Sequence, residues 1–129
     1  MLKVFKIDNY PNNWSCTIEI NPDFIIQERS TPDKVCTCHD VMASMISYWH
    51  GGDERLKILN GKIDKTFAQQ LAREIFLILA EGNKTVKGVI AEFENREGWS
   101  SMDGSWGIKI IEVDDLSFDH DDFDVEEVK

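Results

Sequence analysis

Two kinds of hydrophobic periodicity divide this chain, and their order restricts the fold more than any other feature. Apolar residues alternate with polar ones from Leu2 to Ile7, from Trp14 to Ile20, and again from Ile108 to Val113. Alternation of this kind is typical of strands with one face in a core. Residues 31–95 between them show helical spacing instead. Strands and helices that are segregated along a chain favour an α+β fold over a parallel βαβ sheet.

The first two strands are expected to form an antiparallel hairpin, because residues 8–13 between them are rich in turn-forming types. With the third strand they predict a three-stranded antiparallel sheet, with about three helices packed on one face. The order of the strands does not follow from the sequence.

Helix-capping signals divide the central region. A threonine followed by proline and an acid is a typical helix start, and a glycine often follows a helix end. These signals predict helices from Thr31 to about Tyr48, from Asp53 to Leu59, from Asp64 to a C-terminal glycine at Gly82, and from Thr85 to about Asn95.

Negative charge is concentrated at the C-terminus. Residues 112–129 contain nine acids and one lysine, whereas residues 1–111 contain fifteen acids and thirteen basic residues. We therefore expect one domain over residues 1–113, followed by an acidic tail over residues 114–129. This charge repels nucleic acid and membranes, and it favours a basic protein partner if it favours any. Solubility alone is the simpler explanation of the tail.

The tail also carries apolar residues that solubility does not require. Either they pack on the edge of the domain, or they dock a partner as an acidic-aromatic segment. For the second alternative, the candidate partner-binding residues are Phe118, Asp119, Asp121, Asp122, Phe123 and Asp124.

A glycine-rich aromatic loop over residues 97–107 is the other candidate surface. Trp99, Met102, Asp103 and Trp106 are its candidate partner-binding residues, since loops commonly carry recognition. The alternative is that the tryptophans turn inward and cap the core. In either case we expect the segment around Trp49 to form the opposing wall.

Metal and catalytic motifs are weak. Cys36, Cys38 and His39 are the best candidate ligands, but zinc sites usually need a second pair of ligands downstream. On a helix, Cys36 and His39 would share a face. We find no nucleophile elbow, no zinc-protease motif and no P-loop. The sequence predicts no cofactor, and the three cysteines are expected to be free thiols in the cytoplasm.

Two segments resemble a known family. The first segment is Tyr48-Trp49-His50-Gly51 with the following Asp53-Glu54-Arg55-Leu56. The second is residues 97–110, which contain a Gly-Trp…Met-Asp-Gly…Gly-Ile pattern. Together with the acidic tail, they resemble domain of unknown function family 2528 over about residues 42–128. The resemblance implies a small acidic protein of bacteria, phages or mobile elements, and no catalytic residue.

The leading hypothesis is a non-enzymatic accessory protein that binds another protein. One alternative is an inhibitor that mimics the charge of DNA and blocks a nucleic-acid-binding host defence protein, because clustered carboxylates can imitate phosphates. A second alternative is a small enzyme whose site leaves no sequence motif.

Overall fold

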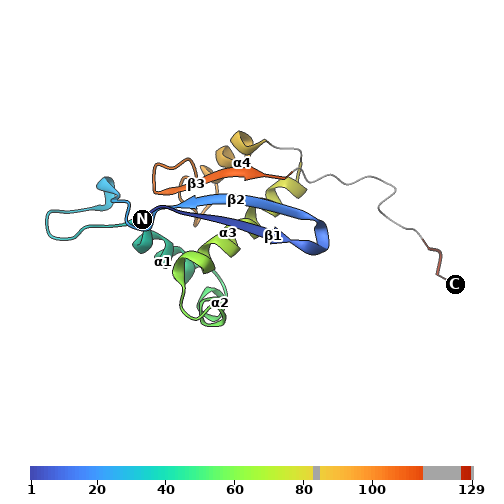
Figure 1. The fold of residues 1–129 in the computed structure, drawn as a ribbon, viewed down its shortest axis with the longest axis horizontal. Coiled ribbons are helices and arrows are strands. Elements are labelled where there is room, and N and C mark those ends of the chain that lie inside the picture. The colour runs from blue at the N-terminus through green and yellow to red at the C-terminus, as the bar shows by residue number, and fades with distance from the viewer. Residues whose placement is uncertain (83–84, 115–125, 129) are drawn as a thin grey trace.

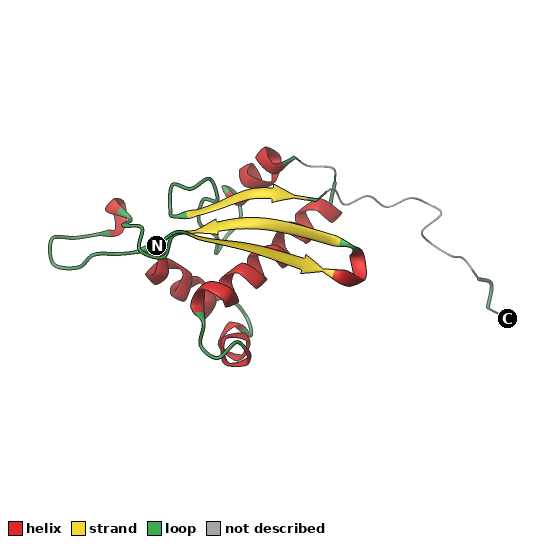
Figure 2. Ribbon diagram, in the orientation of Figure 1, coloured by secondary structure: helices red, strands yellow, loops and turns green. Residues whose placement is uncertain are grey.

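Three antiparallel strands and four helices form the α+β fold that the periodicity predicts (Figures 1 and 2). The computed structural model describes residues 1–82, 85–114 and 126–128. The strands are β1 (Lys3–Asn9), β2 (Trp14–Ile20) and β3 (Ile108–Val113), and the helices are α1 (Cys38–Tyr48), α2 (Gly52–Ile58), α3 (Ile63–Ala80) and α4 (Val86–Phe93). Two 3-10 turns, Tyr10–Asn12 and Gln27–Arg29, lie in the connections.

The sheet order is β1-β2-β3, so the second strand of the hairpin is central. β1 pairs with β2 from Lys3↔Ile20 to Asn9↔Trp14. β3 pairs with the other edge of β2, and its register shifts between Thr17 and Ile18. The shift leaves Ile111 as an extra residue in β3, which is the arrangement of a β-bulge.

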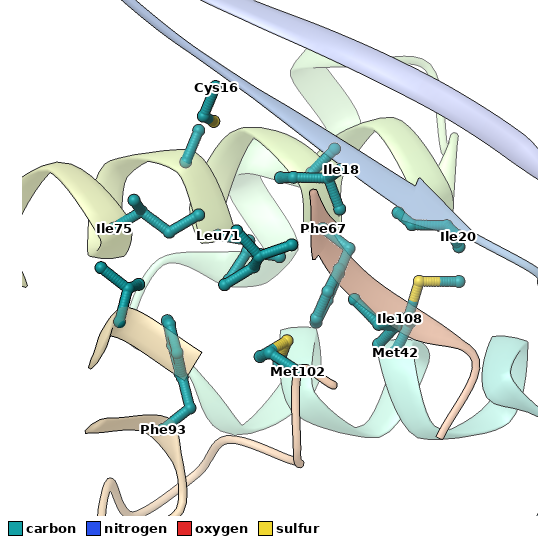
Figure 3. Packing of buried hydrophobic residues seen from close by; sticks show 14 of the residues in the cluster. Cys16, Ile18, Ile20, Met42, Phe67, Leu71, Ile75, Phe93, Met102 and Ile108 are labelled. Atoms are coloured by element: carbon teal, nitrogen blue, oxygen red, sulfur yellow. The ribbon is translucent and has the colours of Figure 1, made fainter. Parts of the chain in front are cut away.

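The core lies between one face of the sheet and the helices (Figure 3). Every second residue of β2 is buried, as its alternation predicts. α3 supplies the largest helical contribution, because an apolar face recurs along its 18 residues. Its buried residues include Phe67, Leu71 and Ile75, which face Cys16 and Ile18 of the sheet in Figure 3.

The predicted start of the first long helix is wrong. Residues 31–34 form a turn in which the amide of Thr31 donates to the carbonyl of Lys34 and the amide of Lys34 donates back to Thr31. α1 begins at Cys38 and is capped by Thr37 and Asp40, each of which accepts the other's backbone amide. This capping box satisfies two amides that a helix start leaves unpaired.

The ends of α3 also differ from the prediction. The helix begins at Ile63, and Asp64 lies in its first turn rather than at the cap. Its carboxylate accepts a hydrogen bond from Lys3 Nζ at 2.6 Å, which ties the helix to edge strand β1. Gly82 lacks the left-handed conformation expected after a helix end. Thr85 caps α4 as predicted, and its hydroxyl accepts the amide of Gly88.

Candidate binding groove

An open groove of about 1000 Å³ lies beside α1. One wall is the excursion, which we define as residues 24–37, between β2 and α1. It projects beyond the end of the sheet (Figure 1). The opposite wall is the aromatic loop, residues 97–107, between α4 and β3. Because the walls come from segments about 70 residues apart, the groove exists only in the folded chain.

The aromatic loop is anchored by Trp99, which is half-buried. Its ring lies 4.6 Å from that of Trp49 and 5.2 Å from that of Phe93, measured between ring centroids, and it also contacts Phe67. The rings of Trp49 and Trp99 therefore pack together, but the wall opposite the aromatic loop is the excursion and not the predicted segment around Trp49. Trp99 caps the core with one part of its ring and lines the groove with another, beside the exposed ring of Tyr48.

A cation–π contact joins the two walls. The guanidinium carbon of Arg29, on the excursion, lies 5.2 Å from the ring centre of Trp106, on the aromatic loop. Stacking on an aromatic ring is a common arrangement for arginine and leaves the edge of the guanidinium free to donate. Within the described ranges, no carboxylate forms an ion pair with Arg29. Its donors therefore remain available to a ligand.

Both signs of charge line the groove. Lys34 lies on the excursion with Arg29, and Asp40 and Glu94 are the carboxylates among the described lining residues. The backbone amide and then the hydroxyl of Thr37 hold the pKa of Asp40 below its ordinary value, and His39 and Lys34 lower it further. Two basic side chains, Arg29 and Lys34, therefore face the groove with two carboxylates, and the carboxylate of Asp40 is held at the helix cap.

Comparison with known proteins identifies the family of this chain. Residues 32–125 match the family described as "Protein of unknown function (DUF2528)". The chain belongs to this family. It is also 29% identical over 124 residues, which cover 88% of each chain, to the protein ea10 of Escherichia phage lambda, and to the same extent to the lambda prophage-derived protein ea10 of Escherichia coli O6:H1. No solved structure gives a significant match.

The two segments that carry the DUF2528 resemblance meet in space. Trp49 belongs to the first and Trp99 to the second, and their rings are in contact. The matched range includes α1, the aromatic loop and β3, whereas β1, β2 and Arg29 precede it. The family match thus covers the aromatic wall of the groove and only part of the excursion.

The other candidates in the aromatic loop lie in different surroundings. Met102 is fully buried, so no partner can reach it without a change in the fold. Asp103 is exposed, and its carboxylate accepts from the hydroxyl and the amide of Ser105, which lowers its pKa. Trp106 is half-buried and lines the groove. Of the predicted loop residues, the structure therefore brings Trp99 and Trp106 to one site.

The candidate residues of the tail, from Phe118 to Asp124, lie outside the described residues. The root of the tail is described, and it is held to β2. Asp114 accepts the amide and the hydroxyl of Ser15 through its side chain, and the indole of Trp14 through its backbone carbonyl, at 2.9–3.0 Å. This root lies at the opposite end of the sheet from the excursion (Figure 1).

The cysteine and histidine cluster does not form a ligand set in the described part of the chain. There, no three histidine, cysteine or acidic side chains gather closely enough to hold a metal ion. Cys36 precedes α1, so its predicted sharing of a helix face with His39 is wrong. Cys38 is buried, and burial raises the pKa of its thiol to about 12. The pKa of the Cys16 thiol is raised to about the same value, first by burial and then by the negative charges of Asp114 and Asp8.

Sequence reasoning missed Arg29, Lys34 and Tyr48 as groove residues. The positions of Arg29 and Lys34 depend on how the excursion turns, which no local motif encodes, whereas Tyr48 is the last residue of α1. The described residues also include no helix long and apolar enough to cross a membrane.

Proposed function

We propose that this chain is a non-enzymatic protein-binding module of phage or related mobile-element origin, which works in the bacterial cytoplasm and docks a partner in the groove. The observation that supports it is the meeting of Tyr48, Trp99 and Trp106 with Arg29 on one open surface. Aromatic residues and arginine supply most of the binding energy at protein interfaces. The phage origin of the ea10 relatives supports the mobile-element setting.

The chemistry of the thiols agrees with a non-enzymatic role. A cysteine nucleophile acts as the thiolate. Cys16 and Cys38 have pKa values raised to about 12, so both are protonated at neutral pH. They act as small apolar groups of the core instead.

The test is a pull-down from host lysate with the full chain and two matched variants. Trp106→Ala removes an aromatic ring from the groove, and Tyr10→Ala removes an exposed ring at the far end of the hairpin. A partner that is retained by Tyr10→Ala and lost with Trp106→Ala supports the groove. A partner that both variants retain equally contradicts it, provided that circular dichroism shows both to be folded.

The second candidate function is mimicry of DNA by the acidic tail. It is favoured by the nine acids of residues 112–129 and by the fixed root at Asp114. A fixed root would display the carboxylates at one end of the sheet, away from the groove. In the same pull-down, a nucleic-acid-binding partner that survives Trp106→Ala and is released steeply by salt would support mimicry over groove docking.

A further inference from the structure

We propose that the groove binds the acidic-aromatic segment, residues 115–125, of a second copy of this chain. A phenylalanine ring of the segment would lie against Tyr48 and Trp99, and the neighbouring aspartate would bind the guanidinium of Arg29. A protein partner at the groove would then compete with this self-association. The inference uses the groove of the proposed function, but the two can fail separately.

The composition of the segment complements that of the groove. It contains two Phe-Asp pairs, Phe118-Asp119 and Phe123-Asp124. Each pair offers an aromatic ring directly beside a carboxylate. The groove offers the matching groups, since aromatic rings lie beside the stacked guanidinium of Arg29 and the ammonium of Lys34. Arginine recognises carboxylates through two parallel hydrogen bonds, which gives the contact direction as well as energy.

Chain length favours the segment of another copy over the chain's own. Asp114 is fixed at the end of β3, and Trp106, which lines the groove, precedes the start of that strand. The six residues of β3 span about 20 Å. Phe118 is four residues beyond Asp114 and can extend at most about 14 Å back, so it cannot reach its own groove. Phe123 is nine residues beyond Asp114 and can span about 30 Å, so of the two pairs only the second could reach the chain's own groove. A second copy has no such limit and can present either pair.

The charge of the rest of the chain decides between a peptide and a nucleic acid. The chain carries 24 acids against 14 basic residues, so a continuous polyphosphate would meet general repulsion. Residues 1–111 alone are close to neutral, with fifteen acids and thirteen basic residues. A short peptide in the groove mainly experiences the charges near it, which include Arg29 and Lys34, because salt screens charges beyond about 10 Å.

The first experiment titrates a fluorescein-labelled peptide of residues 114–129 with the full chain and follows its anisotropy. We expect saturable binding that weakens at least tenfold in Arg29→Gln and in Trp106→Ala. The matched control Arg55→Gln, on exposed α2, should bind as the parent chain does. A peptide in which both phenylalanines are serine keeps all its charge and should lose binding. Binding that is unaffected by the groove variants, or equal for the serine peptide, would overturn the proposal.

The second experiment measures self-association of the full chain by sedimentation velocity over a range of concentrations. We expect an associating species that is lost in Arg29→Gln and in the double variant Phe118→Ser/Phe123→Ser, and kept in Arg55→Gln. A chain that stays monomeric and does not bind the peptide refutes the proposal, even if the groove captures a host protein. Groove-dependent binding of labelled oligothymidylate without binding of the peptide also refutes it and identifies a nucleic-acid site instead.

Discussion

The two walls of the groove are built differently. The aromatic loop is part of the core: Met102 is fully buried, and its carbonyl accepts the amide of Ile110 on β3. The excursion buries one large side chain, Ile26, and is tied to the rest of the molecule mainly at its ends, where Phe24 packs on the core and Thr37 caps α1; between them it is closed by the bonds of Ile26 with Cys36 and of Thr31 with Lys34. Regions with few buried contacts open at lower free energy than the core does. The groove therefore pairs a fixed wall with one that can open locally.

The largest expected difference between the two walls is in the stability lost when a side chain is shortened. Met102→Ala should lower the free energy of unfolding by about 2–5 kcal/mol, because it leaves a cavity in the core. Val35→Ala, at a residue of the excursion that is 54% exposed, should change it by less than about 0.5 kcal/mol. Urea denaturation of both variants measures the comparison. Equal losses would show that the excursion is as firmly integrated as the aromatic loop.

A smaller effect is expected where the two walls touch. Gly107 has φ +87°, and a Cβ there would lie 2.8 Å from Cβ of Phe24 in the excursion. Gly107→Ala should therefore lower stability by about 2–4 kcal/mol, through backbone strain and the clash together.

Gly51→Ala is the matched control for this change. Gly51 has φ +76°, and a Cβ added there would meet no atom within 4 Å, so only the backbone cost of about 1–2 kcal/mol applies. The difference between the two variants in thermal or urea denaturation measures the crowding at Gly107, where Cβ of Phe24 is the nearest atom and the carbonyl oxygen of Asn21 and Cβ of Cys38 follow at 3.0 Å. If the two variants lose the same free energy of unfolding, the neighbours of Gly107 move aside for the added methyl group.

The sequence predicts the fixed parts of the molecule better than the excursion. The alternation in β2 identifies its buried face because burial of every second residue leaves a direct trace in the sequence. Thr85 is correctly predicted as a cap, because a capping threonine is recognised from the residues next to it in the sequence. The start of α1 was predictable too, since Thr37 and Asp40 have capping-box spacing, but the Thr31-Pro32 signal is typical of turns as well as helices.

The groove itself was only partly predictable. Trp49 and Trp99 could be paired because both stand out as large aromatic residues near turns. The contact of Arg29 with Trp106 joins residues far apart in the chain, and it depends on the path of an excursion whose turn is set by its own backbone bonds. Neither residue type nor spacing carries that information.

The junction between the excursion and α1 should show a smaller effect. Thr37 is the last residue of the excursion and caps α1. Thr37→Ala should cost about 1 kcal/mol of stability, the usual loss for an N-cap. Thr31→Ala is the control, because its hydroxyl serves only the turn with Lys34. A larger loss at Thr31 than at Thr37 in urea denaturation would mean that the turn, rather than the cap, holds the excursion in place.

The smallest expected effect is a dependence on pH at the same cap. Hydrogen bonds from the amide and hydroxyl of Thr37 hold the pKa of Asp40 below the ordinary 3.8. A carboxyl whose pKa is lower in the folded state stabilises the fold above its unfolded pKa, and this contribution disappears as the pH falls through the lowered value. Stability measured between pH 6 and pH 2 should therefore fall less steeply in Asp40→Asn than in the parent chain. A slope that Asp40→Asn leaves unchanged would mean that this carboxylate does not stabilise the junction between the excursion and α1.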